Sequence, residues 1–224
     1  MRHHYDDGLG NVSQRSQYWD VGGFVELFTY DALNRIKKSA ITGQTASQAF
    51  ANDAIGNLTS KSDVASGSTY AYPTPGATAV RPHAIKNIPG IGTGAGTFVY
   101  DANGNLTSIP GVLTTSWTSF DMPLQIARGT INSTFGYGPE HQRTRQTRSD
   151  NTTIIYAGAQ EVETKIGVGT TVKTYWPYGV GVEIDRPATG NELNWVHVDR
   201  LGSPVAISDS SGNLKEKLAY DAWG

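Results

Sequence analysis

A six-residue pattern recurs along the chain: aspartate, two variable residues, glycine, asparagine and an aliphatic residue. Its four copies begin at Asp7, Asp53, Asp101 and Asp209. The aspartates at positions 7, 31, 53, 101 and 121 lie 24, 22, 48 and 20 residues apart, which gives a period of about 20 to 24 residues with one interval doubled. Because one such unit cannot bury its own apolar face, each repeat must stack on its neighbours. The pattern therefore predicts a repetitive architecture.

The pattern has the chemistry of a tight turn. A type I turn favours aspartate at its first position and glycine at its fourth. The carboxylate accepts hydrogen bonds from amides two residues on, and glycine adopts a positive φ at no steric cost. Asp101 and Gly104 fit these positions, with Tyr100 before the turn and Leu106 after it. We therefore predict a β-hairpin with a connection of four or five residues.

Weaker copies follow the same logic. After Tyr30-Asp31, Asn34 takes the place of glycine, and asparagine tolerates the left-handed conformation. Phe120-Asp121 is interpreted as a degenerate copy that lacks the glycine and has proline third, which disfavours a type I turn. Near the end of the chain, turns starting at Asp199, Asp209 and Asp221 are 10 and 12 residues apart, which predicts a meander of consecutive hairpins.

Strand-like runs connect these turns. Residues 23–30, 152–156 and 172–176 are rich in β-branched and aromatic side chains. Residues 66–97 have loop composition, and we interpret them as an elaborated repeat rather than a linker because the period resumes at Tyr100. We expect an all-β chain of antiparallel hairpins that form a curved sheet, with no long amphipathic helix.

The composition agrees with short strands and excludes several classes of function. Glycine occurs 26 times and aromatic residues make up 10% of the chain, whereas charged residues make up 17%. A net charge of -2 provides no field that would attract nucleic acid or a membrane surface. The absence of cysteine excludes disulfides, Cys-zinc sites and thiol nucleophiles. There is no apolar signal core near Met1 and no membrane-spanning run, so we predict no membrane insertion by this segment.

Three groups of side chains suggest catalysis or metal binding. His197 and Asp199 share one face of a predicted strand, but a metal site needs a third ligand and Asp199 is explained as a turn residue. The other two groups are carboxylate pairs at i, i+2: Glu161 with Glu163, and Glu183 with Asp185. Such pairs have the separation that a glycosidase needs, yet strand alternation creates them freely. We predict no catalytic residue, no metal and no cofactor, with glycoside hydrolysis as a third hypothesis.

Two further groups concern binding. The basic stretch from His141 to Arg148 places His141, Arg143 and Arg145 on one strand face, and it lacks base-stacking aromatics. We interpret it as a charged strand that guards a sheet edge, and we predict no nucleic-acid partner. Aromatic side chains that stack on sugar rings would support a carbohydrate-binding or adhesion module, which is the second hypothesis. The candidates for this role are Trp117, Trp176, Tyr178 and Trp195.

The ordered set of motifs resembles a known family. Tyr30-Asp31, the segment from Tyr100 to Leu106, and Tyr220-Asp221 look like YD repeats. The run from His197 to Pro204, followed by the Asp209 turn, resembles the start of the Rhs-associated core region. The segment from Arg81 to Ile85 resembles a stretch common just upstream of that core. On this resemblance residues 1–224 form one shell segment, in which residues 190–224 begin the core.

The resemblance to Rhs/YD-repeat proteins implies a function. In that family β-hairpins spiral into a hollow shell that encloses a toxic C-terminal segment; relatives include polymorphic toxins, Tc toxin C subunits and teneurins. It implies a non-catalytic shell segment, secreted or at the cell surface, whose partners are the other segments of the same protein, the enclosed effector and secretion machinery. Glycans are the partner of the second hypothesis. Tyr30, Tyr100 and Tyr220 would stack in ladders between strands.

One departure from the family pattern concerns the chain end. The family core continues beyond the last Tyr-Asp-x-x-Gly and uses a paired Asp-Pro motif for self-cleavage, whereas this sequence stops at Gly224 and contains no Asp-Pro dipeptide. We therefore expect a truncated core, no self-cleavage by this chain, and self-association through a free strand edge. The residues predicted to build the repeat turns are Asp7, Gly10, Tyr30, Asp31, Asp53, Gly56, Tyr100, Asp101, Gly104, Asp199, Gly202, Asp209, Gly212, Tyr220, Asp221 and Gly224.

Overall fold

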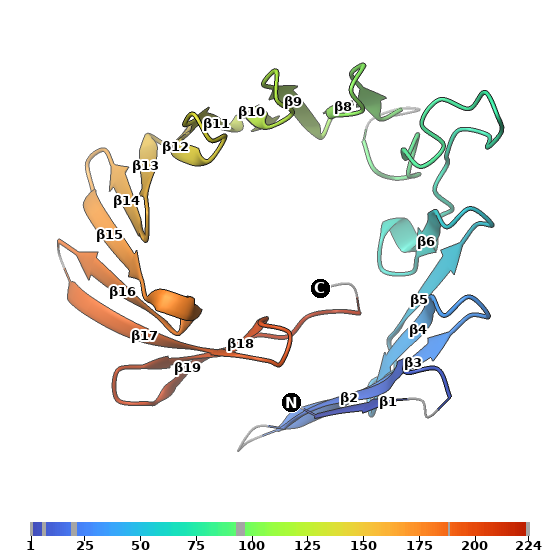
Figure 1. The fold of residues 1–224 in the computed structure, drawn as a ribbon, viewed down its shortest axis with the longest axis horizontal. Helices are drawn as coiled ribbons and strands as arrows, with labels where there is room; N and C mark the ends of the chain where they lie inside the picture. The colour runs from blue at the N-terminus through green and yellow to red at the C-terminus, as the bar shows by residue number, and fades with distance from the viewer. Residues whose placement is uncertain (1, 6–7, 19–21, 93–96, 188, 223–224) are drawn as a thin grey trace. The chain divides into compact units, whose positions relative to one another are not determined.

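The computed structural model describes residues 2–5, 8–18, 22–92, 97–187 and 189–222. Regular structure in these residues consists of antiparallel β-strands and two short 3-10 helices (Figure 1). The predicted all-β class with consecutive antiparallel hairpins is confirmed. The chain divides into two compact units, the first comprising Met1–Val99 with Asp221–Gly224 and the second Tyr100–Tyr220.

The sheet of the first unit contains six strands whose order in space follows their order in sequence. Successive side chains of each strand point to alternate faces of the sheet. The strand Gly23–Tyr30 coincides with the predicted 23–30 strand. The strands are β1 (Arg2–Tyr5), β2 (Val12–Tyr18), β3 (Gly23–Tyr30), β4 (Ile36–Ile41), β5 (Ser47–Asn52) and β6 (Leu58–Lys61).

The sheet of the second unit is also a meander, and its strands again pair in chain order from β7 to β19. It includes the predicted 152–156 strand, and the predicted 172–176 strand lies in β15 except for Trp176, which follows the strand. Its strands are β7 (Val99–Tyr100), β8 (Leu106–Ile109), β9 (Leu113–Trp117), β10 (Pro123–Arg128), β11 (Ile131–Tyr137), β12 (Arg143–Arg148), β13 (Thr152–Ala157), β14 (Gln160–Lys165), β15 (Gly169–Tyr175), β16 (Gly181–Arg186), β17 (Gly190–Val198), β18 (Pro204–Asp209) and β19 (Leu214–Lys217). A 3-10 helix, η2 (Pro177–Gly179), connects β15 to β16.

The segment between β6 and β7 is long, and it packs on the first sheet. The 3-10 helix η1 (Ala65–Gly67) follows β6 directly. The Tyr70 N–H donates to the Thr59 carbonyl (2.7 Å), and Ala71 forms an isolated bridge with Asn87. Tyr70 and Ile88 are buried at 6% and 8% exposure. The loop composition of residues 66–97 thus accompanies a segment with buried side chains of its own.

Seven turns among the described residues share one backbone geometry. In each, the carbonyl of the first residue accepts the N–H of the fourth, and the N–H of the first residue donates to the carbonyl of the fifth. At Asp53 these distances are 3.2 Å from Gly56 and 2.9 Å to Asn57, and Gly56 has a φ of +95°. This is a type I turn followed by a left-handed residue and a bulge. The turns start at Asp31, Asp53, Asp101, Thr118, Gly138, Asp199 and Asp209.

The predicted turn starting at Asp121 is wrong. Thr118 starts this turn, because its N–H donates to Met122 (2.8 Å) and its carbonyl accepts from Asp121 (3.2 Å). Asp121 takes the glycine position at a φ of 59°, which aspartate tolerates better than most residues. The Thr118 hydroxyl accepts from the Met122 N–H (3.1 Å) as a carboxylate would. Pro123 therefore follows the turn instead of interrupting it.

Most of the seven turns lie at the same end of the strands of their sheet. In an antiparallel meander every second connection lies at the same end of the strands. In the first unit the turns starting at Asp31 and Asp53 lie at the same end of the strands. In the second unit the turns at one strand end start at Asp101, Thr118, Gly138 and Asp199. The Asp209 turn connects β18 to β19 and lies at the opposite end.

Few apolar side chains are fully buried, and polar pairs take part in the packing. Phe50 in the first unit and Ile154 in the second are buried at 5% and 3% exposure. Glu26 on β3 is 3% exposed; it forms an ion pair with Arg15 on β2 and accepts a hydrogen bond from Ser39 on β4. The buried carboxylate thus has a partner on each neighbouring strand, as burial of a charge requires.

Candidate functional site

The turn carboxylates are held by backbone and side-chain amides. Asp209 Oδ1 accepts the N–H groups of Ser211 and Asn213 (both 2.9 Å), and its Oδ2 accepts the Asn213 side-chain amide (3.0 Å). The Asn213 amide, followed by the Asn213 backbone N–H, holds the pKa of Asp209 below its usual value against the opposing effect of desolvation. The asparagine that follows glycine in the pattern thus clamps the aspartate at the start of the turn.

Neighbouring turns at the same end of the strands contact one another, and we call this series of contacts the turn ladder. In the first unit the Asn11 side-chain amide donates to Asn34 Oδ1 (3.0 Å), and Arg35 Nη1 donates to the Asp53 carbonyl (2.9 Å). In the second unit Asn103 and Asn105 donate to Asp121 Oδ1 at 2.8 and 2.7 Å. These two amides lower the pKa of Asp121. These contacts therefore fix the relative positions of the turns that they join.

The turn ladder continues between the Thr118 and Gly138 turns, where aromatic rings make the contact in place of carboxylates. Phe120 stacks on His141 with a centroid distance of 4.0 Å and an interplanar angle of 2°. Phe120 also meets Tyr137 edge to face at 5.6 Å. His141 occupies the glycine position of its turn at a φ of 58°. The strained histidine thus contributes a flat surface to the ladder.

An aromatic side chain in or just beyond the strands also reaches back to an earlier strand, and we call this contact the aromatic latch. In each latch an O–H or indole N–H donates to the carbonyl of the first residue of that earlier strand. Burial raises the pKa of Tyr30, so its hydroxyl remains a donor. The latches join Tyr30 to Val12 (2.7 Å), Tyr72 to Leu58 (2.8 Å), Trp117 to Leu106 (2.9 Å), Tyr137 to Pro123 (2.6 Å) and Tyr220 to Pro204 (2.7 Å).

Sequence reasoning assigned Tyr30 and Tyr220 to aromatic ladders, and the structure places both in latches. Tyr100 lies half-buried in β7, where burial raises its pKa. Tyr72, Trp117 and Tyr137 were missed as latch residues. The available signal was an aromatic residue 11 to 18 positions after the first residue beyond a turn.

The remaining predicted turn residues lie as follows. Gly10, Gly56, Gly104, Gly202 and Gly212 all have positive φ, and Asp199 Oδ1 accepts the N–H groups of Leu201 and Ser203. Asp221 uses its carboxylate in an ion pair with Lys61 of β6. Asp7 and Gly224 lie outside the described residues.

The candidate sugar-stacking residues separate into two places. Trp176 and Trp195 meet edge to face at 5.3 Å, and Trp176 is 38% exposed. Tyr178, in η2 on the same connection, is fully exposed with a φ of 63°. Trp117 lies on β9, and its indole N–H forms a latch. The structure thus brings Trp176 and Trp195 together and leaves Trp117 apart.

The candidate catalytic groups have structural partners. Lys173 contacts both members of one carboxylate pair, at 3.4 Å from Glu161 and 3.9 Å from Glu163. His197 Nε2 lies 2.8 Å from the Ser208 hydroxyl. In the other pair, Glu183 Oε1 accepts from the Asn191 amide at 3.3 Å. In the part of the chain that the structure describes, no three His, Cys, Asp or Glu side chains gather around a possible metal position.

The basic stretch does not present one face, which corrects the sequence prediction. Arg145 pairs with Gly136, and after a register shift Arg143 pairs with Tyr137. Paired residues share a face and consecutive residues alternate, so Arg143 and Arg145 point to opposite faces. Arg143 accordingly lies over the Phe135 ring at 4.7 Å. β12 is also an interior strand of the sheet rather than an edge strand.

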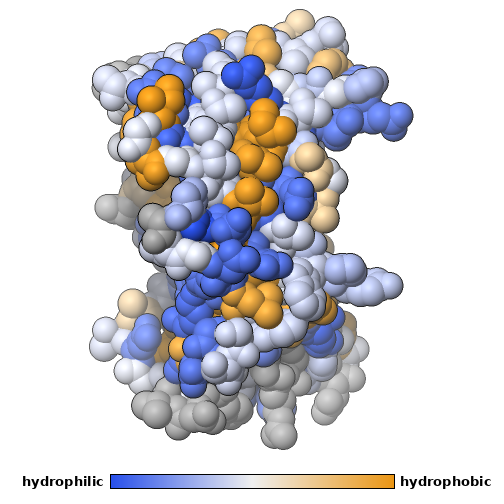
Figure 2. Space-filling model, turned by 90° about the vertical axis from the view of Figure 1, so that its left-hand side faces the viewer, coloured by the Kyte–Doolittle hydropathy of each residue, from blue (hydrophilic) through white to orange (hydrophobic). Residues whose placement is uncertain are grey.

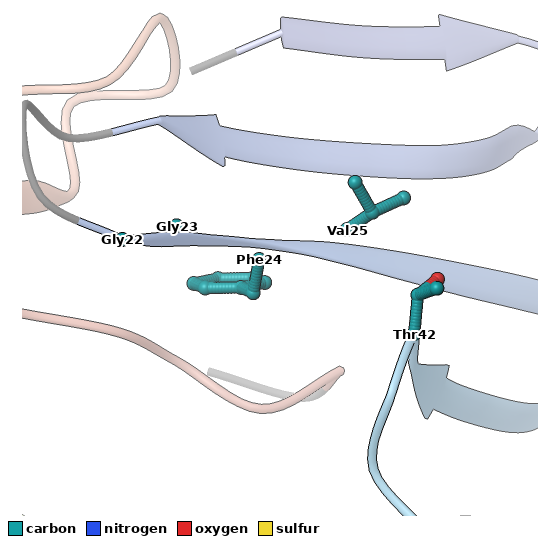
Figure 3. Close-up of a pocket in the computed structure, with 5 residues that line it drawn as sticks. All are labelled: Gly22, Gly23, Phe24, Val25 and Thr42. Carbon is teal, nitrogen blue, oxygen red and sulfur yellow. The ribbon is translucent and has the colours of Figure 1, made fainter.

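A shallow depression on the first unit has no evident chemistry. It is lined by Gly22, Gly23, Phe24, Val25 and Thr42 (Figure 3). Phe24 and Val25 point to opposite sides of β3, as strand alternation requires. None of these side chains is titratable. Among the described residues, no helix is long and apolar enough to cross a membrane.

Comparison with known proteins gives distant curated relatives. No family model matches the chain. The tRNA3(Ser)-specific nuclease WapA of Bacillus spizizenii is 27% identical over 130 residues, which are 56% of this chain and 6% of the relative. The tRNA nuclease WapA of Bacillus subtilis is 25% identical over 130 residues, with the same two coverages. The chain thus spans only a small part of these proteins.

Solved structures match over almost the whole chain. A Photorhabdus luminescens Tc holotoxin pore structure matches with a TM-score of 0.68 and 15% identity, over 98% of this chain and 13% of that chain. The crystal structure of TcdB2-TccC3 matches with a TM-score of 0.56 and 10% identity, over 99% of this chain and 15% of that chain. At these identities the likeness concerns the fold. The chain has the fold of a segment of these Tc toxin proteins, in agreement with its resemblance to the Rhs/YD-repeat shell.

Proposed function

We propose that the chain is a non-catalytic shell segment of a large Rhs/YD-repeat protein, and that the shell encloses a C-terminal toxin or effector. The observation that carries this proposal is the match to the Tc holotoxin structure over 98% of this chain and only 13% of that one. The relatives that share its sequence are likewise far longer than the chain. Its partners on this proposal are neighbouring segments of the same protein and the enclosed effector, in an extracellular setting.

The geometry supports a mechanical role. Hairpins pair side by side through backbone hydrogen bonds, and the turn ladder and latches hold adjacent hairpins in register. The aspartates at the pattern turns are engaged in hydrogen bonds that define those turns, and Lys173 is placed between Glu161 and Glu163. A wall built this way isolates a cargo from solvent without chemistry of its own.

Protease protection tests the proposal. The chain is expressed with the coding sequence on either side of it, and digestion of the C-terminal segment by trypsin is followed over time. We expect that segment to resist digestion, and Ile154→Asp to expose it, because Ile154 is 3% exposed and a charge there disrupts the sheet. Ile166→Asp is the matched control at 76% exposure. Equal digestion of the native and denatured C-terminal segment would refute encapsulation.

A second candidate function is carbohydrate binding at the Trp176–Trp195 pair. The specific observation is that Trp176, at 38% exposure, and the fully exposed Tyr178 lie two residues apart on one connection. Such rings stack on pyranose faces. Glycan-array binding that is lost in Trp176→Ala and retained in Trp117→Phe would support this function. Absence of binding to any glycan at millimolar concentration would dismiss it.

A further inference from the structure

One face of the second sheet carries a row of side chains that crosses five strands. Strand pairing places Arg145 beside Ile155, and Ile155 beside Val162. It then places Val162 beside Val172, and Val172 beside Asp185. Directly paired side chains lie about 4.5–5.5 Å apart on one face. From β12 to β16 the row therefore consists of a cation, three aliphatic side chains and an anion, and we call it the dimer row.

The dimer row lies on the exposed side of these strands. Arg145 and Asp185 are exposed, Ile155 is 42% exposed, and the opposite face of β13 contains Ile154 at 3% exposure. Among the described residues, neither Arg145 nor Asp185 has an ion-pair partner. Figure 2 shows the side of the molecule where β13 to β17 lie in Figure 1, and hydrophobic side chains form a band across it between hydrophilic ones.

Threonines border the row on the same face. Five threonines pair with one another in succession across β11 to β15. Four of them lie two positions along their strand from a residue of the dimer row. The fifth, on β11, lies two positions from Gly136, which pairs with Arg145. The Thr164 and Thr170 hydroxyls are 3.0 Å apart. β-Branched side chains have few χ1 states, so they lose little conformational entropy when a partner covers them. The five are Thr134, Thr147, Thr153, Thr164 and Thr170.

We infer that this face binds the same face of a second copy of the chain, about a two-fold axis at Val162. The row begins with a cation and ends with an anion, so a second copy in the reverse direction places each charge opposite its counterpart. This self-complementarity favours a second copy of the chain as the partner. Arg145 then meets Asp185 of the second copy, and Ile155 meets Val172. Two sheets packed in this way form a sandwich. The surface measures about 24 Å by 17 Å, or about 400 Å² per copy, which corresponds to a weak dimer.

Analytical ultracentrifugation of the 224-residue chain tests this inference. We expect a concentration-dependent dimer that is weaker than one with an interface of standard size. Arg145→Asp and Asp185→Arg each create two like-charge contacts by symmetry, and each should weaken the dimer at least about tenfold. A mixture of the two variants restores both opposite-charge contacts, so it should form a heterodimer with about the native affinity. Arg148→Asp, on the opposite face of the same strand, is the matched control and should dimerise normally.

Other outcomes overturn the inference. A native chain that is monomeric at 500 μM has no such interface. If Arg145→Asp dimerises normally while Glu216→Pro in β19 is monomeric, the copies associate through a strand edge instead. A mixture of the two charge variants that remains monomeric would exclude the two-fold arrangement. Circular dichroism of each variant shows whether its sheet is intact, and a variant that loses its sheet is replaced by Val162→Lys, which should abolish the dimer by placing two ammonium groups at the axis.

Discussion

The aromatic latch at Tyr137 makes a quantitative prediction about stability. Tyr137→Phe removes one hydroxyl and retains the ring, which meets Phe120 edge to face at 5.6 Å. The lost hydrogen bond to the Pro123 carbonyl is 2.6 Å long and partly buried. A hydrogen bond of this kind contributes about 0.5–1.5 kcal/mol net, so we expect a loss of about 1 kcal/mol in the free energy of unfolding.

The measurement is urea denaturation followed by tryptophan fluorescence, with thermal unfolding as a second readout. A loss of about 1 kcal/mol lowers the Tm of a unit of this size by about 4 °C. Tyr178→Phe is the control, because Tyr178 is fully exposed, and it should stay within about 0.5 kcal/mol of the native chain. Equal stabilities of the Tyr137→Phe and Tyr178→Phe variants would refute the latch as a stabilising contact.

Three further predictions concern the turns and the buried ion pair. Gly104→Ala forces a side chain into a φ of +96° and should cost about 1 kcal/mol by urea denaturation. Gly76→Ala, with open space and no positive φ, should be neutral. Glu26→Ala removes the buried carboxylate that faces the partly buried Arg15 guanidinium, which is 15% exposed, and should cost about 3 kcal/mol; a loss below 1 kcal/mol would contradict the ion pair. The lowered pKa of Asp209 contributes stability that is complete above the unfolded value of about 3.9 and is lost as pH falls through the folded value, so the Tm should drop below about pH 4 and Asp209→Asn should flatten that drop.

The repeated pattern made the fold class predictable, because turn chemistry is local. Asp53 and Gly56 are three residues apart, and their hydrogen bonds depend on little else. The β3 strand was predicted at its observed bounds, since residues 23–30 are rich in β-branched and aromatic side chains. Where the pattern degenerates, local reasoning failed: at Thr118 a hydroxyl replaced the carboxylate and Asp121 moved to the left-handed position.

Contacts between repeats could not be predicted from the sequence. The hydrogen bond from Tyr137 to Pro123 joins residues 14 apart, and its partner is a backbone carbonyl that no side-chain pattern reveals. The opposite directions of Arg143 and Arg145 depend on a bulge whose position is fixed by pairing with β11. A one-residue shift reverses every side chain beyond it, so strand faces could be predicted only between bulges.

Electron cryomicroscopy of the protein, expressed with its flanking coding sequence, tests the central claim most directly. We predict that these strands continue into neighbouring segments as one curved wall, and that the enclosed space contains density for a segment from elsewhere in the protein. A map in which the chain forms a separate module, exposed to solvent on both faces of its sheets, would contradict the account.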